Sequence, residues 1–289
     1  MISPRRRNGD AAGASVRAGA LTLAAVGVLM LAPAAHAEDI DVLRGTFSNP
    51  FTSPTYRHWE GFNVGAAFGL ANMHTDFGGS TSNQVAYILR NTTLENEARP
   101  SSWTSLPAKT TDGRSFGAFI GYNLQWDQLV LGVDGAYNHI SSLQSAASDS
   151  MTRILTTSDG VTHTVTITSS SSMKLIDYAT LRARAGYAFG QFLPYAFVGG
   201  AVGRFNSTSS ATVSDHQVQG LTVIDFGPVT QSDNRNNAVT GGFTLGLGID
   251  VAVLPNVFLR GEWEFVGFAQ VNGIRSTVNT GRIGLGVKF

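Results

Sequence analysis

The chain contains no cysteine among its 289 residues. Disulfide bonds, thiolate metal sites and a catalytic cysteine are therefore excluded. Charged residues make up only 14% of the chain, and Lys plus Arg equal Asp plus Glu at 20 each. A protein that binds nucleic acid needs a basic excess gathered on one face, so this balance argues against a nucleic-acid partner.

The chain also lacks a long hydrophobic run. The longest, 18–31, is shorter than the about 20 residues that cross a bilayer as a helix. Arginines at 5–7 precede it, and the small residues that a signal peptidase reads lie at 35–37. We predict a cleaved signal peptide over 1–37 rather than a membrane anchor. Its removal leaves 16 basic and 19 acidic residues (20 − 4 and 20 − 1), a net charge of −3.

What the chain does contain is glycine, at 33 residues, aromatic residues, at 10%, and a strong alternation of apolar with small or polar residues. Residues 38–57 are polar and predict a periplasmic lead-in. From Trp59 onward the period of two that marks a β-strand begins. Phe62, Val64 and Phe68, for example, alternate with small and polar residues. Eight such segments follow: 61–70, 116–125, 129–138, 181–189, 192–205, 239–250, 257–265 and 282–289.

Each segment is long enough to cross a bilayer as a tilted strand, which takes about 9–11 residues. An even number of antiparallel strands in up-and-down order can close into a ring without an edge. The pattern therefore predicts an all-β fold, an eight-stranded antiparallel transmembrane β-barrel over 58–289, in a bacterial outer membrane. In the fifth segment the glycines leave the direction of the side chains open.

The connections between these segments alternate in length. Tight turns are expected around 125–127, 190–191 and 254–256, and long connections over 72–113, 140–174, 206–237 and 267–276. Outer-membrane barrels place short turns in the periplasm and long loops outside, so the long connections are predicted to be extracellular. Most of these connections are interpreted as solvated loops, but 161–167 and 218–224 alternate enough to extend hairpins beyond the membrane.

Nine charged residues share one side of the predicted strands. They are Asp134, Arg182, Arg184, Asp250, Arg260, Glu262, Glu264, Arg282 and Lys288. An Arg or Lys facing lipid at mid-bilayer costs about 2–4 kcal/mol, which predicts that this side faces the lumen. Because side chains fill an eight-stranded barrel, a mutually paired plug is favoured over a narrow pore. The pairs expected first join Arg182 and Arg184 to Glu262 and Glu264.

The sequence offers little for catalysis or metal binding. Its histidines are scattered, without the spacing of a metal site. His139, followed by Ser141, could serve a lipid hydrolase, but no supporting acid is identifiable. Gly199-Gly200 and Gly241-Gly242 fall inside strand patterns and indicate bending or close packing rather than a phosphate site. We expect no cofactor, no metal and no enzymatic activity.

The last strand ends on Phe289, after apolar residues at every second position. This ending resembles the terminal signature that the outer-membrane assembly machinery reads. Aromatic residues near the predicted turns suit an interfacial girdle. They are Trp126, Tyr122, Phe189, Phe192 and Tyr195.

Three stretches together resemble the opacity-type, OmpA-like outer-membrane porins over residues 58–289. Residues 59–65 (WEGFNVG) resemble that family's W-x-G-F-Y-V-G opening, with Asn63 in place of Tyr. Residues 181–187, followed by 193–195, resemble its fourth and fifth strands, and 284–289 its end. The resemblance implies an eight-stranded surface protein of the cell envelope, without catalytic residues to carry over. The loop after the first strand is longer than the family's pattern.

The expected role is therefore a structural one in the outer membrane, with loops presented to the exterior. The alternatives are a narrow porin for small solutes, a lipid hydrolase and, from a different class, a soluble ligand-binding barrel. The expected partners are outer-membrane lipids and the assembly machinery, and the barrel is expected to close as a monomer.

Overall fold

The computed structural model of the protein describes residues 58–141 and 143–289, which belong to one compact unit. The predicted signal peptide and lead-in lie outside the described residues. The strands are β1 (Gly61–Asp76), β2 (Lys109–Trp126), β3 (Leu129–Ser141), β4 (Gln144–Thr156), β5 (Thr162–Tyr187), β6 (Phe192–Gln219), β7 (Thr222–Ala252), β8 (Val257–Phe268) and β9 (Arg275–Lys288). The helices are α1 (Ser82–Ile88), α2 (Thr93–Ala98) and the 3₁₀ helix η1 (Pro100–Ser102).

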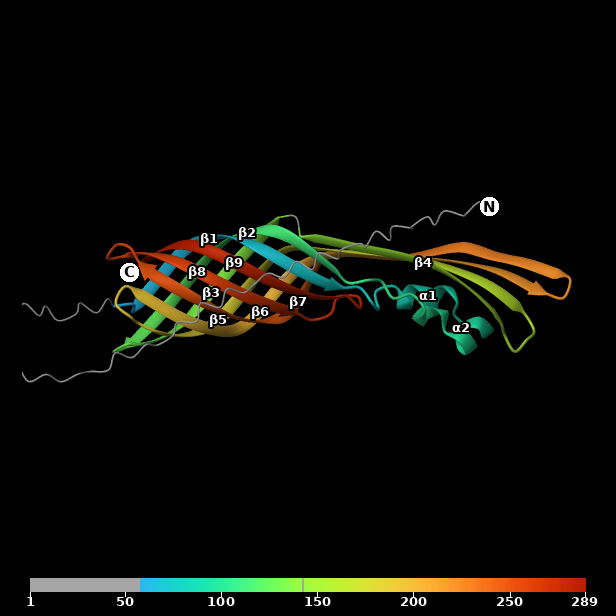
Figure 1. Ribbon diagram of the computed structural model, residues 1–289, viewed down its shortest axis with the longest axis horizontal. Helices are drawn as coiled ribbons and strands as arrows, with labels where there is room; N and C mark the ends of the chain where they lie inside the picture. Colours follow the sequence, from blue (N-terminus) through green and yellow to red (C-terminus); the bar gives the residue numbers. More distant parts are fainter. Residues whose placement is uncertain (1–57, 142) are drawn as a thin grey trace, which may run out of the picture. The chain divides into compact units, whose positions relative to one another are not determined.

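Eight of the strands close into a ring (Figure 1). Around the ring, β1, β2, β3, β5, β6, β7, β8 and β9 pair with their neighbours in antiparallel fashion, and β9 pairs again with β1. Asn63 pairs with Lys288 where the two ends of the ring meet. The eight-stranded barrel predicted from the sequence is confirmed. Each predicted segment falls on one of these strands, and only 181–189 and 282–289 extend past its end, by two residues and one residue.

The alternation of apolar and polar residues sorts the two sides of the barrel wall. In β1, Phe62 and Leu70 point outward and are exposed, whereas Asn63 and Met73 point inward and are buried. The exposed apolar side is the surface that meets lipid in a transmembrane barrel. The described helices are all too short or too polar to span a membrane.

The facing of β6, which the sequence left open, is decided by the structure. Leu193, Tyr195 and Phe197 point inward and are buried. Tyr195 therefore does not belong to the interfacial girdle, where we had expected it. Inside the barrel its hydroxyl donates to Glu262, a partner that the lipid side could not offer. The other four predicted girdle residues are exposed on the outer side.

The three short turns lie where the sequence predicts them. The long connections are far more ordered than solvated loops. Residues 206–237 form a continuous β6–β7 hairpin, and 144–156 form β4, which pairs with β5. Serine and threonine side chains join these strands laterally; for example, the hydroxyls of Thr152 and Thr166 lie 2.8 Å apart. The interpretation of this serine-rich stretch as a loop was wrong because its cross-strand hydroxyl pairs stabilise a strand without an apolar pattern.

β5, β6 and β7 are 26, 28 and 31 residues long, well beyond what a membrane crossing needs. Their distal parts and β4 form a four-stranded sheet beyond the ring, here called the extracellular sheet (144–156, 162–174, 206–219 and 222–237). One face is covered by α1 and α2. Val85 of α1, Leu94 of α2 and Leu89 between the two helices pack against Ile167 and Val213. Thr92 caps α2 by accepting from the Glu95 amide.

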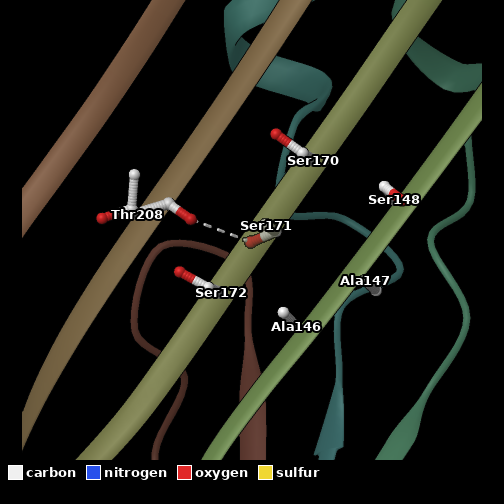
Figure 2. A pocket seen from close by; sticks show the side chains of 7 residues that line it. All are labelled: Ala146, Ala147, Ser148, Ser170, Ser171, Ser172 and Thr208. Atoms are coloured by element: carbon white, nitrogen blue, oxygen red, sulfur yellow. Dashed lines mark hydrogen bonds between the residues drawn. The ribbon is translucent and has the colours of Figure 1, made fainter.

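The opposite face of the extracellular sheet carries small hydroxyl side chains. Figure 2 shows the part where Ala146, Ser148, Ser170, Ser172 and Thr208 line a shallow hollow of about 250 Å³. Hydroxyls on adjacent strands meet in rows, with Ser150 to Thr168 and Thr212 to Thr230 at 2.9 and 2.8 Å. The hydroxyls partner one another across strands, so this face is stable in water without an apolar core.

Two apolar clusters fill the two ends of the barrel interior. Near the short turns, Trp59, Phe119, Leu193, Phe197 and Phe258 form part of one cluster. Near the long connections, a second cluster includes Met73, Phe77, Ile140, Phe205 and Phe268. The middle of the barrel lies between these two clusters.

Close packing across the wall generates a test of the fold. A Cβ atom at Gly199 would collide with the Leu181 carbonyl oxygen and the Cα of Arg182, whereas at Gly200 it would meet nothing within 4 Å. We predict that Gly199→Ala lowers the free energy of unfolding by about 1–3 kcal/mol through overpacking. Gly200→Ala, the neighbouring control on the outer side, should leave it nearly unchanged. Urea unfolding in detergent micelles measures both, and equal effects would contradict the assigned facing.

Candidate functional site in the barrel lumen

Charged side chains gather in the middle of the barrel. Eight of the nine predicted lumen residues come together there, from strands β3, β5, β7, β8 and β9. This ionic cluster comprises Asp134, Arg182, Arg184, Asp250, Arg260, Glu262, Glu264 and Arg282. Its four arginines and four acids are all buried, and Glu262 has the largest exposed fraction at 8%.

Strand register creates the first contacts of the cluster. Arg182 lies directly opposite Asp134 on the neighbouring strand, Arg260 opposite Asp250, and Arg282 opposite Glu262. Directly opposite residues of an antiparallel pair bring their Cβ atoms to about 5 Å. Each of these three arginines can therefore reach an acid without leaving its own strand pair.

One half of the cluster is centred on Asp250 and Asp134. The Arg260 guanidinium donates twice to Asp250, from Nε at 2.8 Å and from Nη2 at 2.9 Å. Arg184 lies 3.2 Å from Asp250. Oδ2 of Asp134 lies 3.4 Å from each of Arg182, Arg184 and Arg260. The bidentate pair holds the planar guanidinium and carboxylate in one geometry.

The other half is centred on Glu262 and Glu264. Arg282 lies between them, 2.9 Å from an oxygen of each. Arg182 lies 3.2 Å from Glu262 and 3.4 Å from Glu264, and also contacts Asp134. Arg182 thus connects the two halves. Of the pairs that we had expected first, those of Arg182 are present, whereas Arg184 contacts Asp134 and Asp250 instead.

Neutral side chains add further hydrogen bonds to the charges. The hydroxyls of Tyr195 and Tyr178 donate to Glu262 at 3.0 Å and to Glu264 at 3.1 Å. Arg184 donates to Asn123 at 3.0 Å, and Arg282 to Asn138 at 2.8 Å. Such bonds satisfy carboxylate and guanidinium groups that the ion pairs leave open.

Aromatic rings cover the faces of the guanidinium groups. The guanidinium carbon of Arg260 lies 4.0 Å from the centre of the Phe119 ring, and that of Arg182 lies 4.3 Å from Phe197. Arg184 lies 4.7 Å from Tyr195. These rings belong to the apolar cluster near the short turns, so the charges are sealed on that side by stacked aromatic groups. The sequence left the side-chain direction of β6, which carries Phe197 and Tyr195, open, and Phe119 on the inner side of β2 was not predicted to contact the charges.

The ninth predicted residue, Lys288, lies at the end of β9 and is half-exposed. Its ammonium group donates to the His58 carbonyl oxygen and lies 5.8 Å from the centre of the Trp59 ring. It therefore belongs to the end of the barrel near the short turns. Phe289 is exposed on the outer side, its amide donating to the Phe62 carbonyl oxygen at 2.8 Å.

The residues considered for catalysis lie elsewhere. His139 is exposed on the outer side of β3. Its cross-strand neighbour Asp177 accepts from Arg204 and from the Tyr137 hydroxyl. Across 58–141 and 143–289, no three His, Asp or Glu side chains are grouped so that they could hold a metal ion.

One family of known proteins matches most of the chain. The family model of the outer membrane protein β-barrel domain matches residues 21–289. No curated protein matches the chain.

Three solved structures are similar to the chain at low identity. Neisserial surface protein A is 14% identical, with 79% of this chain and 97% of that chain covered, at a TM-score of 0.34. The attachment invasion locus protein Ail of Yersinia pestis is 13% identical, with 80% and 99% covered, at 0.32. The N-terminal β-barrel domain of Pseudomonas aeruginosa OprF is 12% identical, with 80% and 98% covered, also at 0.32. With the family model matching nearly the whole chain, this protein belongs to the outer membrane protein β-barrel domain family.

Proposed function

We propose that this protein is a structural component of the outer membrane: a closed barrel that anchors an extracellular sheet and does not conduct solutes. The observation that carries the proposal is the complete pairing of the ionic cluster. Each arginine contacts at least two acids, and each acid contacts at least two arginines. The cluster is neutral overall, which suits a permanently filled lumen.

The burial of these charges supports a plug over a pore. A conducting pore needs a wall that water can reach, whereas the side chains of Arg182 and Glu264 are fully buried. Apolar clusters also close the lumen on both sides of the charges. Burial of ions is tolerated only where they are well paired and hydrogen-bonded. Each charge of the cluster has at least two ionic partners, and among its buried polar atoms Asp134 Oδ1, Arg182 Nε and Arg282 Nε are without a hydrogen-bond partner in the described residues.

The remaining parts of the proposal concern export, assembly and activity. The signal peptide over 1–37 would carry the chain through the inner membrane, and Phe289 would be read by the assembly machinery. The ring closes within one chain, which supports a monomeric barrel surrounded by outer-membrane lipids. A lipid hydrolase that uses His139 is not favoured, because the carboxylate of the nearest opposite residue, Asp177, is held by Arg204 and Tyr137.

The ionic cluster should contribute measurably to stability. Arg260→Met leaves Asp250 without its bidentate partner, and breaking a buried pair costs about 3–5 kcal/mol. We expect urea unfolding in micelles to show a loss of that size, largely recovered in the double variant Arg260→Met/Asp250→Asn. Arg235→Met is the control: its side chain is 60% exposed and 3.6 Å from Asp233, a pair worth about 1 kcal/mol or less. If Arg260→Met changed stability no more than Arg235→Met, the cluster would not be a structural plug.

Electrical recording separates the plug from a narrow porin. We expect purified wild-type protein in planar lipid bilayers to show no steady open level. A steady conductance that falls in Arg182→Gln or Glu262→Gln would show that ions pass along the cluster. That result would overturn the structural proposal in favour of the porin.

A further inference from the structure

The hairpin that joins β6 to β7 ends in an apolar apex. Its two-residue turn is Gly220-Leu221, with Gln219 paired to Thr222 and Val218 to Val223. Leu221 is 104% exposed, Val223 55% and Ile224 56%. Exposed apolar side chains that lie next to one another mark a site of interaction with a partner or a membrane.

The apolar side chains surround the hairpin instead of forming one face. Successive side chains of a strand point to opposite sides, so Val223 and Ile224 lie on opposite faces and Leu221 lies between them at the turn. A flat protein partner would cover one face and leave the other in water. A lipid interface accepts an apolar tip from all sides.

The depth of the apex suits the boundary between lipid headgroups and acyl chains. The cross-strand pair of Gln217 and Ile224 lies about three strand positions from Leu221. This corresponds to a distance of about 10 Å along the hairpin. Interfacial segments bury their apolar side chains about 5–10 Å deep. The backbone groups that β6 and β7 direct at each other are paired within the hairpin, whereas the turn and the outer edge of β7 expose polar backbone, which limits insertion to this boundary.

The charges near the apex indicate which lipids it would meet. Residues 217–224 hold no ionisable side chain, and 214–229 no Lys or Arg. The nearest charges include Asp225 and Asp159, the latter held beside the apex because Gln219 donates to its carbonyl oxygen at 3.0 Å. The Thr157 hydroxyl donates to the Asp159 carboxylate and lowers the pKa of that carboxyl, which keeps it ionised at neutral pH. The His216 imidazole is bound to Asp225 at 2.5 Å, and with no Lys or Arg over 214–229 the apex has no excess of positive charge to attract an anionic surface.

We propose that this apex docks on a zwitterionic lipid bilayer facing the one that holds the barrel. The part of β7 beyond the barrel, 222–237, has 16 residues, which reach about 50 Å when extended. At that distance the apex would contact a second membrane and not the one that holds the barrel.

The test uses the full chain in lipid nanodiscs, mixed with protein-free phosphatidylcholine vesicles and separated by flotation. Wild-type protein should float with the vesicles. The triple variant Leu221→Ser/Val223→Thr/Ile224→Thr keeps strand-forming residues and should reduce the floated fraction about tenfold. Ile154→Thr is the matched control, because Ile154 is 72% exposed but lies on one face of β4, away from the β6–β7 turn. It should float as the wild type does.

A second readout does not depend on removing apolar residues. In Leu221→Trp, the added indole should shift its fluorescence to shorter wavelength when vesicles are added, relative to the wild-type spectrum. Failure of the wild type to float, an equal loss in Ile154→Thr, or flotation only with anionic vesicles would each overturn the proposal. Binding only to vesicles that carry protein, lost in the triple variant, would identify a protein partner and overturn it as well.

Discussion

The pairing of four arginines with four carboxylates inside the barrel is the constraint on which the rest of the structure depends. These charges cannot face lipid at an acceptable cost, and they cannot be buried unless each is neutralised. Because Arg182 contacts Asp134, Glu262 and Glu264, its contacts tie β5 to both β3 and β8 across the lumen. A change in strand register would separate these contacts.

The aromatic and apolar residues above and below the cluster give it the low-dielectric surroundings in which ion pairs are strong. Phe119 and Phe197 stack on guanidinium groups, while Tyr178 and Tyr195 donate to the carboxylates. The same side chains thus exclude water and satisfy polar atoms. A lumen built in this way suits the closed structural barrel that we propose.

The extracellular sheet follows a different physical rule from the barrel. One of its faces is apolar and covered by α1 and α2, whereas the other is held by rows of hydroxyl groups such as Ser150 with Thr168. β4 lies beyond the ring, so lipid does not impose an alternation of apolar and polar residues on it. Without that alternation the sequence pattern did not indicate a strand there. The strands of the sheet are continuations of strands of the barrel wall, so the direction of those strands also sets the direction of the apex hairpin.

The sequence by itself determined the number of membrane-crossing strands, the side-chain direction of seven of them and eight charges that line the lumen. Those properties depend on a local alternation of period two, which lipid on one side and a packed lumen on the other impose along each strand. Only the tertiary structure decided which charges meet: Arg184 with Asp134 and Asp250, and Lys288 beside Trp59. Those contacts depend on the stagger between strands that are far apart in the chain. The inward position of Tyr195 and the existence of β4 were likewise decided there, because each depends on a partner from another strand.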